Sequence, residues 1–289
     1  MILPEPVLAR IAAAFPASPP ADMAPTSGGF SHHSAFATIG AHRCVAKAAA
    51  LPAKRADLRR EAAVLRLLAG RGLPAPTLLA LLDDAEWTIA LTLARPGAPG
   101  VALYAAPLAE RYAAVGALAE LLAQVHQAAL PPPTPDLLLA ARARQALLRL
   151  PELGLPAALR DALAAGLSHP AWYAGAALVH GDAGAHNLLW HPHSATLLDW
   201  EWAGWGSPLI DLAWVGWTLR WRAAGELWPH FAERYRAGNP TAPHVSPADA
   251  RALAIGQIGC ILARVADQPA AFAEWLRRAE WTLDGGAFV

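Results

Sequence analysis

The chain has 289 residues, and its 23 acidic and 23 basic side chains give a formal net charge of zero. This length suffices for one large domain or two lobes with a sizeable core, while the balanced charge offers no basic stripe and argues against nucleic acid as a partner. The two cysteines form no disulfide framework, so we expect a reducing compartment, the cytoplasm.

The N-terminal part is predicted to contain two helices and four strands. Val7, Ile11 and Phe15 recur at helical spacing, and a proline-rich connector follows. A helix is then predicted to begin at an N-capping Asp57 and to end at Gly70. Strands are predicted before and after this helix, over residues 34–39, 43–48, 77–82 and 87–93.

The remainder reads as mainly helical. Apolar residues between Leu108 and Val125 share one helix face, and helices are predicted again from Leu209 to about Leu283. Short strands are expected at 177–179, 188–190 and 196–198. No charge-free stretch is apolar enough to predict a membrane span. The order predicts an α+β fold with two unequal lobes, over 1–94 and 95–289, and a cleft between them.

One motif carries the chemistry. The chain contains His180-Gly181-Asp182, then Asn187, then Leu198-Asp199-Trp200-Glu201. Phosphoryl transfer needs one carboxylate to orient a hydroxyl, and a carboxamide and a second carboxylate to hold Mg²⁺ on the nucleotide phosphates. Asp182, Asn187 and Asp199 fit these three roles in that order. Glu201 is either part of an outer metal shell or a solvated carboxylate.

The order of these motifs resembles the aminoglycoside phosphotransferase and choline kinase-like family, whose fold is similar to that of protein kinases. The resemblance covers roughly residues 20–285 and implies a protein-kinase-like fold with a nucleotide-binding lobe over 1–94 and a catalytic, acceptor-binding lobe over 95–289. It implies that Asp182 is the catalytic base, that Asn187 and Asp199 are Mg²⁺ ligands, and that Lys47 binds the phosphates of ATP or GTP while Glu61 holds this lysine.

The resemblance also implies nucleotide contacts elsewhere in the N-terminal part. Gly28, Gly29 and Ser31 are similar to the turn that covers the phosphates, and Leu93 ends a strand similar to the hinge that binds adenine. Asp211 resembles the carboxylate that supports the catalytic loop. The chain departs from the family pattern at His32, where Asn is usual, and at Ala185-His186, where Pro-Gly is common.

The acceptor implied is a hydroxyl of a small molecule, an aminoglycoside or another antibiotic. A metabolic kinase of the choline, ethanolamine, homoserine, sugar or nucleoside type is an alternative, and so is a nucleotide-binding pseudokinase. Seven of the twelve tryptophans lie between Trp200 and Trp228 and form either core or an aromatic wall for the acceptor.

Overall fold

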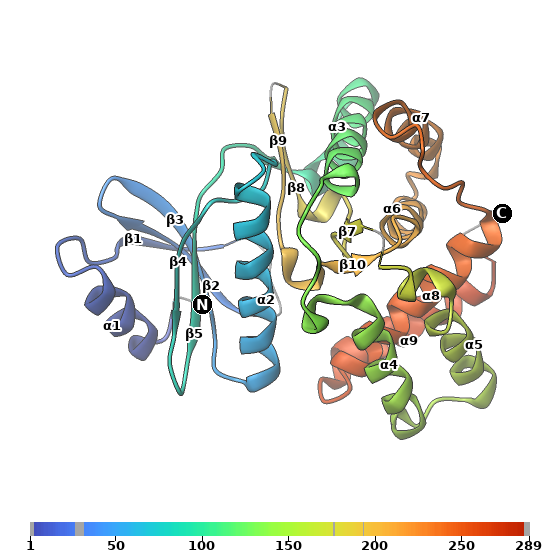
Figure 1. The fold of residues 1–289 in the computed structure, drawn as a ribbon, viewed down its shortest axis with the longest axis horizontal. Helices are drawn as coiled ribbons and strands as arrows, with labels where there is room; N and C mark the ends of the chain where they lie inside the picture. The colour runs from blue at the N-terminus through green and yellow to red at the C-terminus, as the bar shows by residue number, and fades with distance from the viewer. Residues whose placement is uncertain (1–2, 27–31, 176, 193, 286–289) are drawn as a thin grey trace. The chain divides into compact units, whose positions relative to one another are not determined.

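The protein is described by a computed structural model that covers residues 3–26, 32–175, 177–192 and 194–285. The chain divides into two units, which are described separately: a first unit of Met1–Ala98 and Thr196–Trp202, and a second unit of Pro99–Ala195 and Ala203–Val289. A β-sheet dominates the first unit and helices dominate the second (Figure 1). The predicted fold class, a β-rich N-terminal part followed by a mainly helical C-terminal part, is confirmed.

The sheet of the first unit has five antiparallel strands within the described residues, in the order β1-β2-β3-β5-β4. The predicted hairpin is present as β2 and β3, and Gly40 in its turn has a φ of 59°, a conformation that glycine adopts without steric cost. Lys47 pairs with Ala90 inside the sheet. The strands are β1 (Ala21–Pro25), β2 (His33–Ile39), β3 (His42–Ala49), β4 (Leu78–Asp83) and β5 (Thr88–Leu93).

Two helices lie on opposite sides of this sheet, α1 (Glu5–Ala14) and α2 (Pro52–Ala69) (Figure 1). Val7 and Ile11 of α1 share an apolar cluster with alternate strand residues such as Ala46. Leu58 of α2 packs in a second cluster that includes Ala90. Strand β5 is accordingly buried over four successive residues, whereas in β2 only alternate residues are buried.

Two predictions for this unit were wrong. Helix α2 begins at Pro52 rather than at Asp57, because proline suits the first helical turn, where its missing N–H costs nothing. Asp57 lies inside the helix and accepts a hydrogen bond of 3.1 Å from Arg60. The connector before the hairpin contains strand β1, which pairs with β2 at the edge of the sheet, where proline is tolerated.

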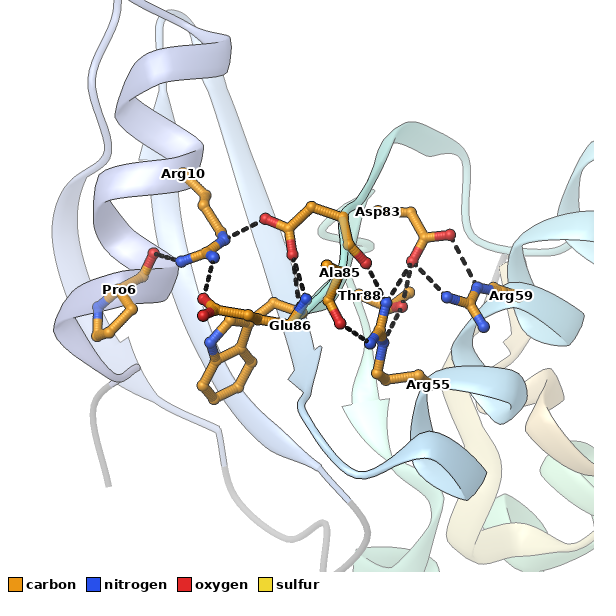
Figure 2. A network of polar contacts seen from close by, with 10 residues as sticks. Pro6, Arg10, Arg55, Arg59, Asp83, Ala85, Glu86 and Thr88 are labelled. Carbon is orange, nitrogen blue, oxygen red and sulfur yellow. Dashed lines mark hydrogen bonds and ion pairs between the residues drawn. The ribbon is translucent and has the colours of Figure 1, made fainter.

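An ion-pair network joins both helices to the turn between β4 and β5 (Figure 2). Arg10 of α1 reaches Asp84 at 2.5 Å and Glu86 at 2.6 Å. Arg59 of α2 makes two hydrogen bonds of 2.8 Å to the carboxylate of Asp83, and Arg55 also bonds this turn. The helix that carries Glu61 is thus tied to the sheet by side chains as well as by apolar packing.

The second unit is built from helices around a short strand pair. Strand β7 (Ala177–Val179) pairs antiparallel with β10 (Gly204–Gly206), and β8 (Leu188–His191) belongs to the same unit. The short strands β6 (Ala98–Pro99) and β9 (Ser194–Leu197) each contain residues of both units. In the part of the chain that the structure describes, no helix is long and apolar enough to cross a membrane. The helices are α3 (Leu108–Gln127), α4 (Leu139–Arg149), α5 (Ala157–Leu167), α6 (Leu209–Trp221), α7 (Trp228–Gly238), α8 (Pro247–Arg264) and α9 (Pro269–Leu283).

Candidate active site

The first unit brings three of the predicted residues together. Lys47 Nζ lies 2.8 and 3.0 Å from the two carboxylate oxygens of Glu61, and 2.9 Å from Asp199 Oδ1. Strand β3 positions the lysine, helix α2 the glutamate, and the segment Thr196–Trp202 the aspartate. Glu61 is only 3% exposed, so this lysine is held by a buried carboxylate rather than by solvent.

Electrostatics keep this lysine charged. Burial works against its protonation, but the carboxylates of Asp199, Glu61 and Glu201 outweigh burial and raise the pKa of Lys47 well above its ordinary value. A permanently charged ammonium at the centre of a sheet is suited to binding phosphate oxygens.

Asp199 has a strained backbone. Its φ of 63° lies in the left-handed region that residues other than glycine seldom adopt. Such conformations cost free energy and cluster at functional sites. The side chain of Asp199 is 37% exposed, and Oδ1 is the atom that contacts Lys47.

Glu201 is not a solvated carboxylate. It is 2% exposed, and its Oε2 lies 2.5 Å from Nε2 of His32. His32 is the residue that departs from the family's usual Asn, and its side chain is 4% exposed. The pair joins the start of β2 to the segment that carries Asp199. Sequence reasoning did not find it, since the two residues stand 169 positions apart.

The predicted nucleotide contacts at Gly28, Gly29 and Ser31 lie outside the described residues. Leu93 is the last residue of β5, and its N–H donates to the carbonyl oxygen of Thr77 at 2.9 Å. The N–H of Leu93 is therefore already used within the protein.

The second unit brings Asp182 and Asn187 together. Asn187 Nδ2 donates to the backbone carbonyl of Asp182 at 2.9 Å and to its Oδ2 at 3.0 Å. Both partners are acceptors, so the hydrogen-bond network assigns nitrogen to this side of the amide. The amide oxygen of Asn187 consequently points away from Asp182 and is available as a ligand for a hard cation.

Buried groups hold the loop that carries Asp182. Asp211 accepts hydrogen bonds from the backbone N–H groups of His180 at 2.6 Å and Gly181 at 2.8 Å, and His126 Nε2 lies 3.0 Å from the same carboxylate. Tyr235 in turn contacts His126 Nδ1 at 2.7 Å. These contacts fit the supporting role that the resemblance implies for Asp211.

Two further side chains contact Asp182. Trp214 Nε1 donates to Asp182 Oδ1 at 2.8 Å, and His186 Nε2 lies 3.2 Å from the same oxygen. From the sequence, Trp214 is expected either in the core or in an aromatic wall for the acceptor, and His186 stands out only as a departure from the family pattern. The only sequence signal was the spacing of four residues between Asp182 and His186.

These contacts also set the acidity of Asp182. Burial alone would raise the pKa of its carboxyl, but positive charge at His186, the contacts from His186 and Trp214, and charge at His180 lower the pKa below its usual value. The ionised form, which can accept a proton, is therefore the stable one at neutral pH.

Trp214 and Trp217 belong to the core. They are 2% and 1% exposed, and their rings stack with centroids 4.6 Å apart and an interplanar angle of 8°. Trp275 of α9 stacks on both at 6.1 Å. This packing of α6 against α9 fixes the ring planes rather than presenting them as an open wall.

The oxygen donors suit magnesium. Asn187 and Asp199 offer an amide oxygen and a carboxylate oxygen, the hard ligands that Mg²⁺ prefers when it retains waters and binds nucleotide phosphates. In the described residues no group of three or more His, Cys, Asp or Glu side chains is arranged to hold a metal by itself. The amide oxygen of Asn187 in the second unit and the carboxylate of Asp199 in the first unit are thus each the kind of ligand that Mg²⁺ accepts.

Comparison with known proteins also indicates a phosphotransferase. A family model described as the phosphotransferase enzyme family matches residues 22–252, whereas no curated protein matches the sequence. The ternary complex of a thermostable aminoglycoside phosphotransferase APH(4)-Ia mutant with AMP-PNP and hygromycin B has a TM-score of 0.68 and 18% identity, over 99% of this chain and 100% of that one.

Two other solved structures share the fold. Aminoglycoside-3'-phosphotransferase of type VIII has a TM-score of 0.67 and 23% identity, over 87% of this chain and 98% of that one. Macrolide 2'-phosphotransferase MphH from Brachybacterium faecium has a TM-score of 0.62 and 20% identity, over 97% and 98%. Because the family model matches well over half of the chain, the predicted enzyme class, a small-molecule phosphotransferase, is confirmed, and the chain belongs to the phosphotransferase enzyme family.

Proposed function

We propose that this protein transfers the γ-phosphoryl group of ATP, bound with Mg²⁺, to a hydroxyl group of an aminoglycoside or another antibiotic of comparable size. The observation that carries the proposal is the pair of hydrogen bonds from Asn187 Nδ2 to Asp182, which ties a candidate base to a candidate metal ligand. Enzymes of this kind stabilise a loose transition state mainly by positioning and charge.

Each residue then has a distinct task. Lys47 binds the nucleotide phosphates through its ammonium group, and buried Glu61 fixes the direction of that group. Asn187 and Asp199 would supply oxygen ligands to Mg²⁺, and the bound ion would neutralise charge on the phosphates. Asp182 accepts a hydrogen bond from the acceptor hydroxyl and takes its proton as the phosphoryl group is transferred.

The acceptor class rests on similarity. The APH(4)-Ia structure contains hygromycin B, and MphH is a macrolide 2'-phosphotransferase. Both acceptors are hydroxyl-bearing antibiotics, and both proteins cover nearly the whole of this chain. Whether the protein uses GTP in place of ATP is tested by letting the two nucleotides compete in the same assay.

The test is a screen for product mass with Mg²⁺ and ATP over pools of aminoglycosides, macrolides, cyclic peptides, nucleosides, amino alcohols and sugars. We expect a phosphorylated product from an antibiotic pool and a fall of about 100-fold or more in Asp182→Asn. Asp161→Asn, the same change at an exposed residue of α5, is the matched control. Undiminished turnover by Asp182→Asn, or no product despite tight ATP binding, would contradict the proposal.

A further inference from the structure

The two carboxylate oxygens of Asp182 differ in their number of protein partners. Oδ1 accepts the indole N–H of Trp214 at 2.8 Å and lies 3.2 Å from His186 Nε2, whereas Oδ2 accepts one hydrogen bond, from Asn187, within the described residues. A carboxylate oxygen has two lone pairs. Both lone pairs of Oδ1 therefore have a protein partner, and Oδ2 keeps one lone pair for another donor.

The terminal torsion of an aspartate is soft and broadly populated. A single hydrogen bond from Asn187 to Oδ2 would still allow the carboxylate to rotate about that contact. A second donor on the other oxygen removes this rotation. Trp214 is such a donor, because an indole N–H can donate but cannot accept.

The side chain of Trp214 is buried and packed against other rings. It is 2% exposed, and it stacks on Trp217 of the same helix and on Trp275 of α9, at centroid distances of 4.6 and 6.1 Å, while Trp275 also stacks on Trp217. The direction of its N–H is consequently fixed by core packing. The core of the second unit thereby sets the orientation of the carboxylate.

We propose that Trp214 is a positioning residue for Asp182, and that the acceptor hydroxyl donates to Oδ2. This inference rests on the proposed function, since it assigns the step that Trp214 assists. In a loose transition state the hydroxyl loses its proton late, so the direction of the carboxylate matters more than its basicity. Removing the indole N–H leaves Oδ1 with only its longer contact of 3.2 Å to His186, so the carboxylate is held less firmly and a lone pair of Oδ2 faces the hydroxyl in a smaller fraction of complexes.

The chain contains a matched control for this residue. Trp217 lies one turn further along α6, is 1% exposed and also donates its N–H at 2.8 Å, but to Thr282 Oγ1. Phe at either position removes one indole N–H while keeping an aromatic ring in the stack. A purely structural role predicts equal effects of Trp214→Phe and Trp217→Phe, and a positioning role predicts unequal ones.

The first measurement needs no acceptor. Indole ¹H–¹⁵N spectra of the full chain are recorded for the parent, Trp214→Phe, Trp217→Phe and Asp182→Asn. The two Phe variants assign the two resonances by their disappearance. We expect Asp182→Asn to move the Trp214 resonance to lower proton shift, since a charged acceptor makes the stronger hydrogen bond, and to move the Trp217 resonance much less.

The second measurement uses Mg²⁺·ATP with hygromycin B, and with water as the acceptor in parallel. We expect Trp214→Phe to lose roughly 10- to 100-fold in kcat, the effect of one hydrogen bond to a charged group, with the KM for ATP unchanged. Trp217→Phe is expected to keep most of its kcat, while thermal unfolding shifts by similar amounts in both variants.

Equal kcat losses in the two Phe variants, or a Trp214 resonance that Asp182→Asn leaves in place, would overturn the inference and leave the proposed function intact. Turnover in the parent that survives Asp182→Asn would instead overturn the proposed function. A parent that turns over neither hygromycin B nor water would overturn the catalytic role of Trp214 as stated here, whatever the spectra show.

Discussion

At the scale of residues, the departures from the family pattern come with partners of their own. His32 stands where Asn is usual, and it pairs with buried Glu201. His186 stands where Gly is common, and its ring contacts Asp182. The ring of His186 also needs space beside Gly184, where a Cβ would lie 2.7 Å from two of its atoms. Each residue that departs from the family pattern therefore has a partner in this chain: His32 contacts Glu201, and His186 contacts Asp182.

Gly184→Ala tests the contact between His186 and Asp182. The backbone of Gly184 has a φ of 173°, so alanine causes no backbone strain; its Cβ would displace the ring of His186 and would lie 3.3 Å from Thr218 Oγ1. We expect kcat to fall by about tenfold, as for one lost hydrogen bond to a charged group, with little change in thermal unfolding. Gly70→Ala, whose Cβ would make only ordinary contacts of 3.5 Å or more, is the control. Equal activity of the two variants would show that the ring does not act on Asp182.

Lys47→Ala tests the phosphate-binding role. The variant removes the ammonium group and leaves Glu61 buried without it, so we expect ATP affinity to fall by roughly 10- to 100-fold. Titration with a fluorescent ATP analogue measures the effect. The only other lysine, Lys54, supplies the control Lys54→Ala, which is expected to bind as the parent does. Unchanged affinity in Lys47→Ala would remove this residue from the nucleotide site.

At the scale of elements, α2 matters because it carries Glu61. Apolar contacts of Leu58 hold it on the sheet, and Arg59 ties it to Asp83 at the turn between β4 and β5. Arg10 ties α1 to Asp84 and Glu86 at the same turn (Figure 2). Ion pairs therefore hold both helices to the turn between β4 and β5.

This network predicts a dependence of stability on pH. The hydrogen bond from Arg10 and two backbone N–H groups lower the pKa of Asp84 to about 2, whereas an unfolded aspartate has a pKa of about 3.9. A lowered folded pKa contributes stability above the unfolded value and loses it as pH falls towards the folded one. The difference in free energy of unfolding between the parent and Asp84→Asn should be constant above pH 5 and shrink between about pH 4 and pH 2.

Urea unfolding at several pH values measures this difference, and Asp161→Asn on the exposed face of α5 is the control. A difference that stays the same down to pH 2 would mean that Asp84 is not held by Arg10 in solution.

At the scale of the whole molecule, nucleotide and metal should stabilise the fold together. A ligand that binds only the folded state at 100 times its Kd adds about 2.7 kcal/mol, which corresponds to a rise of roughly 5 to 10 °C in Tm for a chain of this size. We expect this rise with ATP and Mg²⁺ and a smaller one when EDTA removes the metal. Asp199→Asn should lose most of the difference. A rise that EDTA leaves unchanged would contradict the metal-binding role.

Much of this arrangement was predictable from local patterns. The loop from His180 to Asn187 carries its chemistry at fixed offsets, and the hairpin around Lys47 follows from alternation and Gly40. The bonds from Trp214 to Asp182 and from His32 to Glu201 were not predictable, because they join residues 32 and 169 positions apart that only tertiary packing brings together. The start of α2 was missed because a proline in the first turn outweighed a capping aspartate.

The most direct test is a single-turnover transfer of γ-³²P from ATP to the acceptor that the screen identifies, by the parent and by Asp182→Asn, each preloaded with ATP and started with Mg²⁺. We expect a labelled acceptor from the parent and at least a 100-fold slower transfer by the variant, with ATP equally bound in both. Equal rates of transfer by the two proteins would contradict the assignment of Asp182 as the base.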